Sequence, residues 1–425
     1  MNYLSLSREA LLSEHAVQKA RYEAFLSEGL SLDLSRGKPS PEQLDLSNAF
    51  LCAVGDPSDA KAENGFDCRN YGELAGLPEA RRFFSSYTGI PAEQIIVGGN
   101  SSLNLMYDAI ARCMLFGTVG SKKPWCREEK LRFLCPVPGY DRHFAITESF
   151  GFEMIPVAMT EAGPDMDEVE RLVKDESVKG IWCVPKYSNP TGVTYSDETV
   201  RRLAEMQTAA PDFRIFWDNA YALHAFSCDD DTLADILSLA RAAGNEDRVF
   251  YFTSTSKITY PGGGIAMIAA SEANLALVRK AMSVQTIGHD KINQLRHVRF
   301  FREEGSLRAH MLAHGRVIGR KFRLLFSALD AELADSGIAT WTQPKGGYFS
   351  SLDVLPGCAT RVYNLCREAG VTLTKVGATF PYGRDPEDKN LRLAPSFATD
   401  EALSKAAEVL SVAVKLAALE KLLSE

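Results

Sequence analysis

The stretch 250–267, FYFTSTSKITYPGGGIAM, decides the fold. An apolar run leads into a group of hydroxyl side chains, then Lys257, and then three glycines. A lysine usually keeps its charge in water, yet Lys257 follows directly on a run with the composition of a buried strand. In open α/β sheets, ligands bind at the carboxyl ends of the strands. The residues that follow such runs are therefore the ones to compare along the chain.

Six further apolar runs precede or follow this one, and helical stretches separate them. They are QIIVGG (94–99), LRFLCP (131–136), FEMIPVAM (152–159), KGIWCVP (179–185), FRIFWD (213–218) and GIAMIAAS (264–271). The intervening segments include predicted helices at 101–117 and 196–208, the second with Ser196 as its N-cap. Several runs are apolar on both faces, as in a sheet that helices cover on both sides. We therefore predict an α/β fold with a mainly parallel seven-stranded sheet.

The pattern changes near residue 305. A long helical stretch, 305–335, leads into two predicted strands around Gly346 and Gly347. A helix, the short strands VTLTK and NLRLAPS, and a final helix from about Thr399 complete the chain. We read this part as a smaller α+β domain, on which the N-terminal helix could pack. The predicted division is an N-terminal segment of the small domain at 1–50, a large domain at 51–305, and the C-terminal part of the small domain at 306–425.

Composition excludes several classes of protein. The 425 residues carry a net charge of −8 and no block of basic residues, so nucleic acid is not an expected partner. No stretch approaches the ~20 apolar residues of a membrane span, and the N-terminus, with Glu9 and Glu14, is unlike a signal peptide. The nine cysteines form no CxxC pair, which favours reduced thiols. We expect a cytoplasmic protein without a membrane partner.

Two patterns suggest metal ions but do not support a site. His310 and His314 have the i, i+4 spacing of metal ligands, without the adjacent glutamate of an HExxH motif. The acidic run Asp229 to Asp231 lacks the spacing of an EF-hand loop. We predict no metal site.

Polar side chains follow four of the runs. In chain order they are Asn100, Ser101 and Ser102; Asn189; Asp218 and Tyr221; and Lys257. Singly, each has an ordinary explanation as a helix cap, a turn residue or a solvated charge. Together they match one chemistry. A partly buried lysine is a nucleophile, a helix N-terminus with hydroxyl groups binds phosphate, and a carboxylate can hold a pyridine nitrogen protonated. These are the requirements of pyridoxal phosphate.

The order of the motifs resembles a known family. The motifs, in order, are NYGELAGLPEAR, GGNSS, PVPGYDRHF, SNPTG, DNAY, STSK and NLRLAPS. Over nearly its whole length the chain resembles the class I, fold-type I aminotransferases, which depend on pyridoxal phosphate. LDLSRGKPSPEQLDL and TSTSKITYPGGG resemble the divergent aspartate aminotransferase branch of the family, whose members are also labelled MocR-related.

The resemblance assigns roles around the cofactor. It implies that Lys257 forms the Schiff base and moves the proton between Cα and the cofactor, that Asp218 pairs with the pyridine nitrogen, and that Tyr140 stacks on the ring. Tyr221 and Asn189 would hold the ring hydroxyl oxygen. The residues implied at the phosphate are Asn100, Ser101, Ser102, Ser254 and Ser256, with Tyr71 reaching the phosphate of a neighbouring subunit. A homodimer with shared active sites is therefore implied.

The glycine run departs from the family pattern. Most relatives carry a phosphate-binding arginine about eight residues after the lysine, where this chain has Gly262, Gly263, Gly264 and Ile265. Either a charge comes from elsewhere, or the backbone at Gly264 approaches the phosphate closely because no Cβ intervenes. A turn or β-bulge is the alternative explanation.

The resemblance implies less about the substrate. Arg392 would bind the substrate α-carboxylate as a bidentate fork, beside Gly37 and Asn189. The candidates for a second, side-chain carboxylate are Arg36, Lys38, Lys186 and Lys291. We expect aspartate and 2-oxoglutarate to exchange an amino group by a ping-pong mechanism. A lyase or decarboxylase with the same cofactor is the first alternative, and a regulator module that binds the cofactor without turnover is the second.

Overall fold

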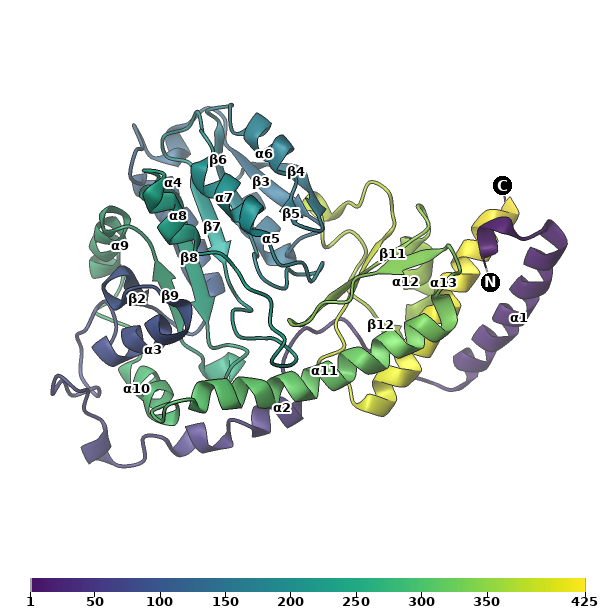
Figure 1. Cartoon of the computed structure of the whole chain (residues 1–425), viewed down its shortest axis with the longest axis horizontal. Coiled ribbons are helices and arrows are strands. Elements are labelled where there is room, and N and C mark those ends of the chain that lie inside the picture. The colour runs from purple at the N-terminus through teal and green to yellow at the C-terminus, as the bar shows by residue number, and fades with distance from the viewer. Residues whose placement is uncertain (1, 425) are drawn as a thin grey trace.

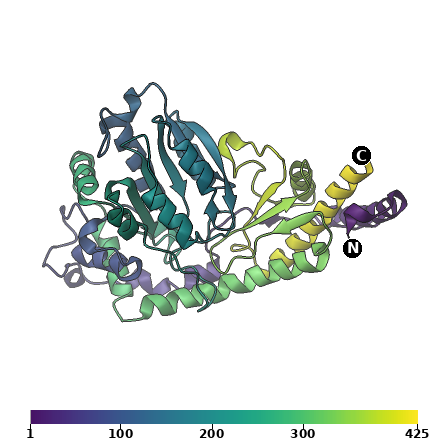
Figure 2. The same cartoon turned by 45° about the horizontal axis from the view of Figure 1, so that its top comes forward.

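The computed structural model describes residues 2–424, and they form two parts side by side. A large α/β part and a smaller part are connected along one side by the long helix α11 (Ser306–Leu333), as Figure 1 shows. Figure 2 gives a second view in which the strands of the large part face the viewer.

The large part contains a sheet with the strand order β2-β9-β8-β7-β6-β3-β4-β5. The strands are β2 (Ile95–Val97), β3 (Arg132–Val137), β4 (Glu153–Thr160), β5 (Gly163–Pro164), β6 (Val178–Cys183), β7 (Arg214–Asp218), β8 (Val249–Ser254) and β9 (Ala266–Ala269). Only β9 and β5 run against the others. All seven predicted strands are present, and the two-residue β5 extends the sheet by one.

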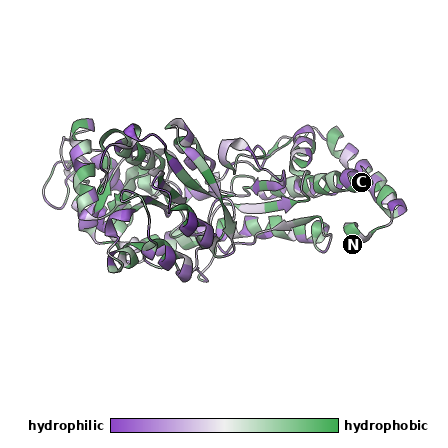
Figure 3. Ribbon diagram, turned by 90° about the horizontal axis from the view of Figure 1, so that it is seen from above, coloured by the Kyte–Doolittle hydropathy of each residue, from purple (hydrophilic) through white to green (hydrophobic). Residues whose placement is uncertain are grey.

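Helices cover both faces of this sheet because successive strand residues alternate between the faces. In β7, Phe216 belongs to one apolar cluster and Trp217 to the other, and neither is exposed. One face packs against α3 (Pro78–Thr88), α6 (Met166–Leu172), α7 (Asp197–Glu205), α8 (Ile236–Ala242) and α10 (Lys291–Phe300). The other packs against α4 (Ser102–Phe116), α5 (Asp141–Ser149) and α9 (Glu272–Gln285). Most of these helices carry both hydrophilic and hydrophobic residues (Figure 3).

Local sequence explains where these helices begin. The Ser196 hydroxyl accepts a hydrogen bond from the Thr199 backbone nitrogen at 3.1 Å, so Ser196 is the predicted N-cap of α7. Ser101 caps α4 in the same way, through the backbone nitrogen of Leu103 at 3.1 Å. Capping fixes the start of α4 at the end of β2, where a phosphate site is predicted.

Both ends of the chain build the smaller part. This part contains the antiparallel sheet of β10 (Ala339–Trp341), β11 (Ser350–Val354) and β13 (Asn390–Leu393), together with helices α1 (Arg8–Ser27), α11, α12 (Ala359–Glu368) and α13 (Asp400–Ser424). Helix α1 packs on α13 at the outer end of the molecule (Figure 1). Strand β1 (Leu32–Asp33) pairs in parallel with β12 (Val371–Thr372). The short helix α2 (Pro41–Asp45) follows β1 and contacts α11.

One apolar cluster joins residues from both ends, from Tyr3 to Leu34 and from Leu325 to Leu419. The domain boundaries at 50 and 305 stay a prediction. Within residues 2–424, no helix has the length and apolar content that crossing a membrane requires.

Candidate active site

A cavity of about 330 Å³ lies where the parallel strands of the large sheet end and the smaller part begins. Most of the predicted site residues line it: Gly37, Ser101, Ser102, Tyr140, Asn189, Asp218, Tyr221, Ser254, Ser256, Lys257 and Arg392. The predicted residues outside the lining are Asn100, Gly264, Tyr71, Arg36, Lys38, Lys186 and Lys291. Segments up to about 350 positions apart in the sequence thus meet at one edge of the sheet.

Lys257 follows β8, and its amine lies beside two aromatic rings. Its Nζ atom lies 5.2 Å from the ring centre of Tyr221 and 5.7 Å from that of Tyr348. Burial lowers the pKa of Lys257, and the charge of Asp218 acts in the opposite direction. A lowered pKa increases the fraction of neutral amine, which is the nucleophilic form.

Asp218 ends β7 and is almost completely buried. Its Oδ2 atom lies 3.1 Å from Nε2 of His143, which must carry the hydrogen because a carboxylate only accepts. His143 in turn stacks on Trp182, with ring centres 4.3 Å apart. Oδ1 of Asp218 is buried without a hydrogen-bond partner among residues 2–424. A buried, unpaired carboxylate oxygen facing a cavity fits a protonated ring nitrogen of a ligand.

Three polar side chains stand around the same cavity. Tyr221 and Asn189 are 3% and 4% exposed, and Tyr140 is half-buried at the start of α5. Burial raises the pKa of the Tyr221 and Tyr140 hydroxyl groups. Both phenols therefore keep their protons at neutral pH and can donate hydrogen bonds to a ligand.

Serine hydroxyl groups form the end of the cavity near β2 and β8. Ser254 Oγ donates to Ser256 Oγ at 3.1 Å, and Ser256 Oγ donates to the backbone oxygen of Asn100 at 3.2 Å. A Cβ atom on Gly264 would lie 3.0 Å from that same Asn100 oxygen and 3.2 Å from the Ser256 backbone nitrogen. Glycine therefore allows the segment before β9 to approach this loop closely, and a Cβ atom would require the backbone to shift by a few tenths of an ångström.

The carbonyl groups of the glycine run are held from the opposite side. Nδ2 of Asn293 donates to the oxygens of Gly263 and Gly264 at 2.8 and 3.0 Å. None of the residues that line the cavity supplies a cation from the position of the missing family arginine. Hydroxyl groups and backbone NH groups are what this end of the cavity offers to a phosphate.

Arg392 reaches the cavity from β13 of the smaller part. Its Nη1 atom donates to Oδ1 of Asp141 at 2.9 Å and to Oδ1 of Asn189 at 3.5 Å, and its Nε donates to Thr374 at 3.3 Å. The guanidinium lies 4.9 Å from the ring centre of Phe349. Its charge is thus accessible to a carboxylate that enters the cavity.

Gly37 lies beside the same phenylalanine. A Cβ atom there would lie 2.0 Å from the ring of Phe349, so only glycine fits. The loop that carries Gly37 therefore closes one side of the cavity against β11.

Comparison with known proteins identifies the family. The family model described as aspartate amino-transferase matches residues 6–425. The chain belongs to this family. It is 48% identical to an aspartate aminotransferase of Corynebacterium glutamicum over 96% of this chain and 94% of the relative. The solved structure of an aspartate transaminase from the same organism superimposes with a TM-score of 0.97, at 46% identity and 99% coverage of both chains. The resemblance drawn from the motifs is confirmed.

This aminotransferase uses pyridoxal phosphate, as the family does. An α-aminoadipate aminotransferase of Thermus thermophilus, solved with N-(5'-phosphopyridoxyl)-L-leucine, shares the fold at a TM-score of 0.74 and 23% identity, over 98% of this chain and all of the other. The residues present fit the cofactor. The unpaired oxygen of Asp218, the neighbouring amine of Lys257 and the hydroxyl groups near Gly264 meet the needs of its ring nitrogen, aldehyde and phosphate.

Several residues of the aminotransferase site were missed from sequence. His143 and Asp141 contact Asp218 and Arg392, and Arg142 lines the cavity. His143 lies in the motif that contains Tyr140, three residues further on, so it had a usable signal: three residues correspond to one turn of a helix, and α5 begins there.

The predicted cation candidates contact other groups instead. Arg36 pairs with Asp33 at 2.8 Å, and Nζ of Lys38 lies 4.0 Å from the ring centre of Phe397. These two side chains are exposed.

The other two cation candidates, Lys186 and Lys291, are buried. Lys186 Nζ lies 2.7 Å from Asp230, and Lys291 Nζ donates to the backbone oxygen of His289 at 2.7 Å. Tyr71 is 78% exposed, on the loop before α3.

The histidines of the excluded metal pattern also make protein contacts. His310 Nε2 lies 2.7 Å from the oxygen of Ile258, next to Lys257, and 3.0 Å from Nε2 of His314. Within residues 2–424 no group of three potential metal ligands occurs. The pair packs against the segment that carries Lys257.

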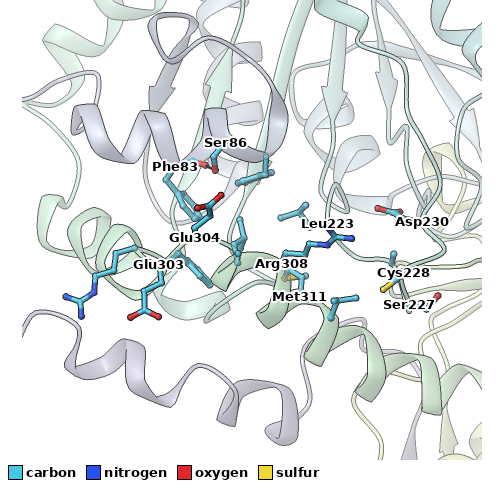
Figure 4. Close-up of a pocket in the computed structure, with 17 residues that line it drawn as sticks. Phe83, Ser86, Leu223, Ser227, Cys228, Asp230, Glu303, Glu304, Arg308 and Met311 are labelled. Atoms are coloured by element: carbon cyan, nitrogen blue, oxygen red, sulfur yellow. Dashed lines mark hydrogen bonds between the residues drawn. The ribbon is translucent and has the colours of Figure 1, made fainter.

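A larger cavity of about 800 Å³ contains none of the predicted site residues. Figure 4 shows it between α3, the beginning of α11 and the segment around Leu223, with Arg308 extending toward Leu223. Chemistry, and not volume, identifies the aminotransferase site.

Proposed function

We propose that this aminotransferase exchanges an amino group between L-aspartate and 2-oxoglutarate by a ping-pong mechanism. The observation that carries the proposal is the meeting of Lys257, the unpaired oxygen of Asp218 and the guanidinium of Arg392 in one cavity. The preference for aspartate is supported by the 48% identity to a relative that is named an aspartate aminotransferase.

Each half-reaction needs a group that binds the amino acid and a group that moves its proton. Arg392 binds the α-carboxylate, which fixes the Cα–H bond relative to Lys257. Lys257 Nζ, in its amine form, would accept the proton from Cα and later give it to the carbon that carried the carbonyl group. Its lowered pKa suits this role because a base must be unprotonated at the operating pH.

The remaining roles concern charge at the ring. Pyridoxal phosphate supplies the carbonyl carbon that carries the amino group and the ring that withdraws electrons. Asp218 would keep a proton at the ring nitrogen, with His143 orienting its carboxylate. Tyr221 and Asn189 would donate to the ring oxygen, and Tyr140 would pack on the ring. Ser101, Ser102, Ser254 and Ser256, with the backbone at Asn100 and Gly264, would hold the phosphate.

A lyase or decarboxylase with the same cofactor is the second candidate. Which bond at Cα breaks depends on how the substrate is held, and Arg392 would hold its α-carboxylate. The 48% identity to a relative named an aspartate aminotransferase favours amino transfer over loss of carbon dioxide.

We also propose a homodimer in which Tyr71 contacts the phosphate of the neighbouring subunit. The 78% exposure of this tyrosine supports the proposal, because a tyrosine so exposed is available to a second chain. Sedimentation of the wild-type protein and of Tyr71→Phe, with the cofactor affinity of each, tests it. A cytoplasmic location stays a prediction from the cysteine content.

The visible absorption spectrum of the purified protein tests the reaction. We expect a yellow band that aspartate alone bleaches and that 2-oxoglutarate restores. Release of ammonia or carbon dioxide from a single amino acid would instead identify a lyase or decarboxylase. A band that aspartate does not change would keep the cofactor assignment and remove aspartate as the donor.

A further inference from the structure

A dicarboxylic substrate needs a second cation, and the cavity contains one that has no assigned role. Three cationic side chains line it: Lys257, Arg392 and Arg142. Lys257 and Arg392 already serve the amine chemistry and the α-carboxylate. The candidates on the substrate loop and on α10 do not line the cavity.

Arg142 is free to bind a ligand. Its side chain makes no hydrogen bond, ion pair or ring contact with another of residues 2–424, and it is exposed at the cavity. The neighbouring acid does not neutralise it, because Asp141 is paired with Arg392. An arginine with an uncompensated charge in a cavity is a bidentate site for a carboxylate.

The position of Arg142 in the fold favours the substrate over the phosphate. It lies in the first turn of α5, directly after β3, whereas the serines that face the phosphate follow β2 and β8. In the strand order, β6 and β7 separate β3 from β8, so the two strand ends are about 14 Å apart. On the substrate side, Arg142 is the chain neighbour of Asp141, which touches Arg392.

The electrostatics of Tyr140 support the same placement. Burial and two nearby acids raise the pKa of the Tyr140 hydroxyl. The positive charges of Arg142 and Arg392 act in the opposite direction. Tyr140, Arg142 and Arg392 all line the same cavity, so both positive charges face the space that a substrate enters.

We propose that Arg142 binds the side-chain carboxylate of the dicarboxylic substrate and so sets the preference for aspartate over neutral amino acids. The inference rests on the proposed function, because it presupposes that a dicarboxylate is the substrate. It adds a specificity residue from the same chain as Lys257 and Arg392.

The test compares the wild-type holoenzyme with Arg142→Gln and Arg142→Lys. We expect Arg142→Gln to lower kcat/KM for aspartate by about 10- to 100-fold and that for alanine by less than about threefold. Arg142→Lys should recover part of the aspartate activity because it restores the charge without the fork. Arg316→Gln is the matched control, since Arg316 is an exposed arginine outside the cavity.

A binding measurement without turnover complements the kinetics. Succinate contains two carboxylates and no amino group, and propionate contains one. We expect Arg142→Gln to weaken succinate binding, measured by calorimetry, by about 10-fold or more while propionate binding is unchanged. The cofactor dissociation constant should also stay the same.

The outcomes separate the two proposals. If wild-type protein uses aspartate and Arg142→Gln keeps the aspartate-to-alanine ratio, the Arg142 inference is overturned and the proposed function stands. If the variant loses aspartate and alanine equally, or loses the cofactor, Arg142 has another role and the inference is also overturned. If wild-type protein does not use aspartate or bind succinate, both proposals fail.

Discussion

Oδ2 of Asp218 accepts a hydrogen bond from Nε2 of His143 at 3.1 Å, while Oδ1 of the same carboxylate has no partner within residues 2–424. The protein thus fixes one carboxylate oxygen of Asp218 and leaves the other available to a ligand in the cavity. Stacking on Trp182 fixes the imidazole itself. Trp182 and His143 therefore hold the carboxylate of Asp218 in one orientation.

This arrangement predicts a non-additive pair of variants. Asp218→Asn removes the charge but keeps the shape, and we expect kcat to fall by about 100-fold or more. His143→Asn should cost about 10-fold in the wild-type background and almost nothing beside Asp218→Asn, because the histidine acts through the carboxylate. Steady-state kinetics of the four proteins measure the coupling. Equal effects of His143→Asn in both backgrounds would show that it acts independently.

Asp141 Oδ1 accepts a hydrogen bond from Nη1 of Arg392 at 2.9 Å, so this carboxylate competes with that of an entering ligand. We expect Asp141→Asn to tighten propionate binding about three- to tenfold, because the guanidinium no longer has an internal anion to exchange. Calorimetric titration of the holoenzyme measures this. Asp197→Asn, on an exposed helix start, should leave propionate affinity unchanged. Weaker binding in Asp141→Asn would mean that Asp141 orients Arg392 and does not compete.

Two neighbouring glycines offer a matched test of the phosphate end. A Cβ on Gly264 would meet the backbone at Asn100 and Ser256, whereas a Cβ on Gly262 would meet nothing within 4 Å. We expect Gly264→Ala to weaken cofactor binding about 10-fold, because the loop must shift, and Gly262→Ala to leave it unchanged. Fluorescence titration of the apoprotein with pyridoxal phosphate gives both constants. Equal cofactor dissociation constants for the two variants would mean that the phosphate binds away from this loop.

Buried histidines predict the pH dependence of stability. Burial lowers the pKa of His224 and His314 to about 3 and that of His297 to about 4. In the unfolded chain these groups titrate near 6.5, so the unfolded state binds more protons at lower pH. Their stabilisation is complete above that value and decreases as the pH falls toward the folded pKa.

We therefore expect Tm to fall between about pH 7 and about pH 5. His224→Gln should flatten the slope of Tm against pH, whatever its effect on Tm at neutral pH. His15→Asn, which removes a partly exposed histidine on α1, is the control and should keep the wild-type slope. A constant Tm across this range would contradict the burial argument.

The large sheet was predictable because buried parallel strands leave continuous apolar runs, and the chemistry follows directly after them. The run before Lys257 and the one before Asp218 end where β8 and β7 end, within two residues. The two-residue strands β1, β5 and β12 leave no such run. Their pairing depends on packing between distant segments.

The residues that bind the substrate were harder to predict. A charge in the sequence does not show its partner: Lys186 is buried beside Asp230, whereas Arg142 is exposed and unpaired among residues 2–424. Ion pairing depends on the tertiary structure, so the four predicted candidates did not include Arg142, which lines the cavity. The motif around Tyr140 contained Arg142 and His143, but the resemblance assigned a role only to Tyr140.

The packing of α1 against α13 has a consequence for synthesis of the protein. Residues 8–27 leave the ribosome early, whereas residues 400–424, which cover them, emerge nearly 400 positions later. The central sheet can form while α1 still lacks its partner, because its strands all lie before residue 270. During translation the face of α1 that packs against α13 therefore stays uncovered until the end of the chain has emerged.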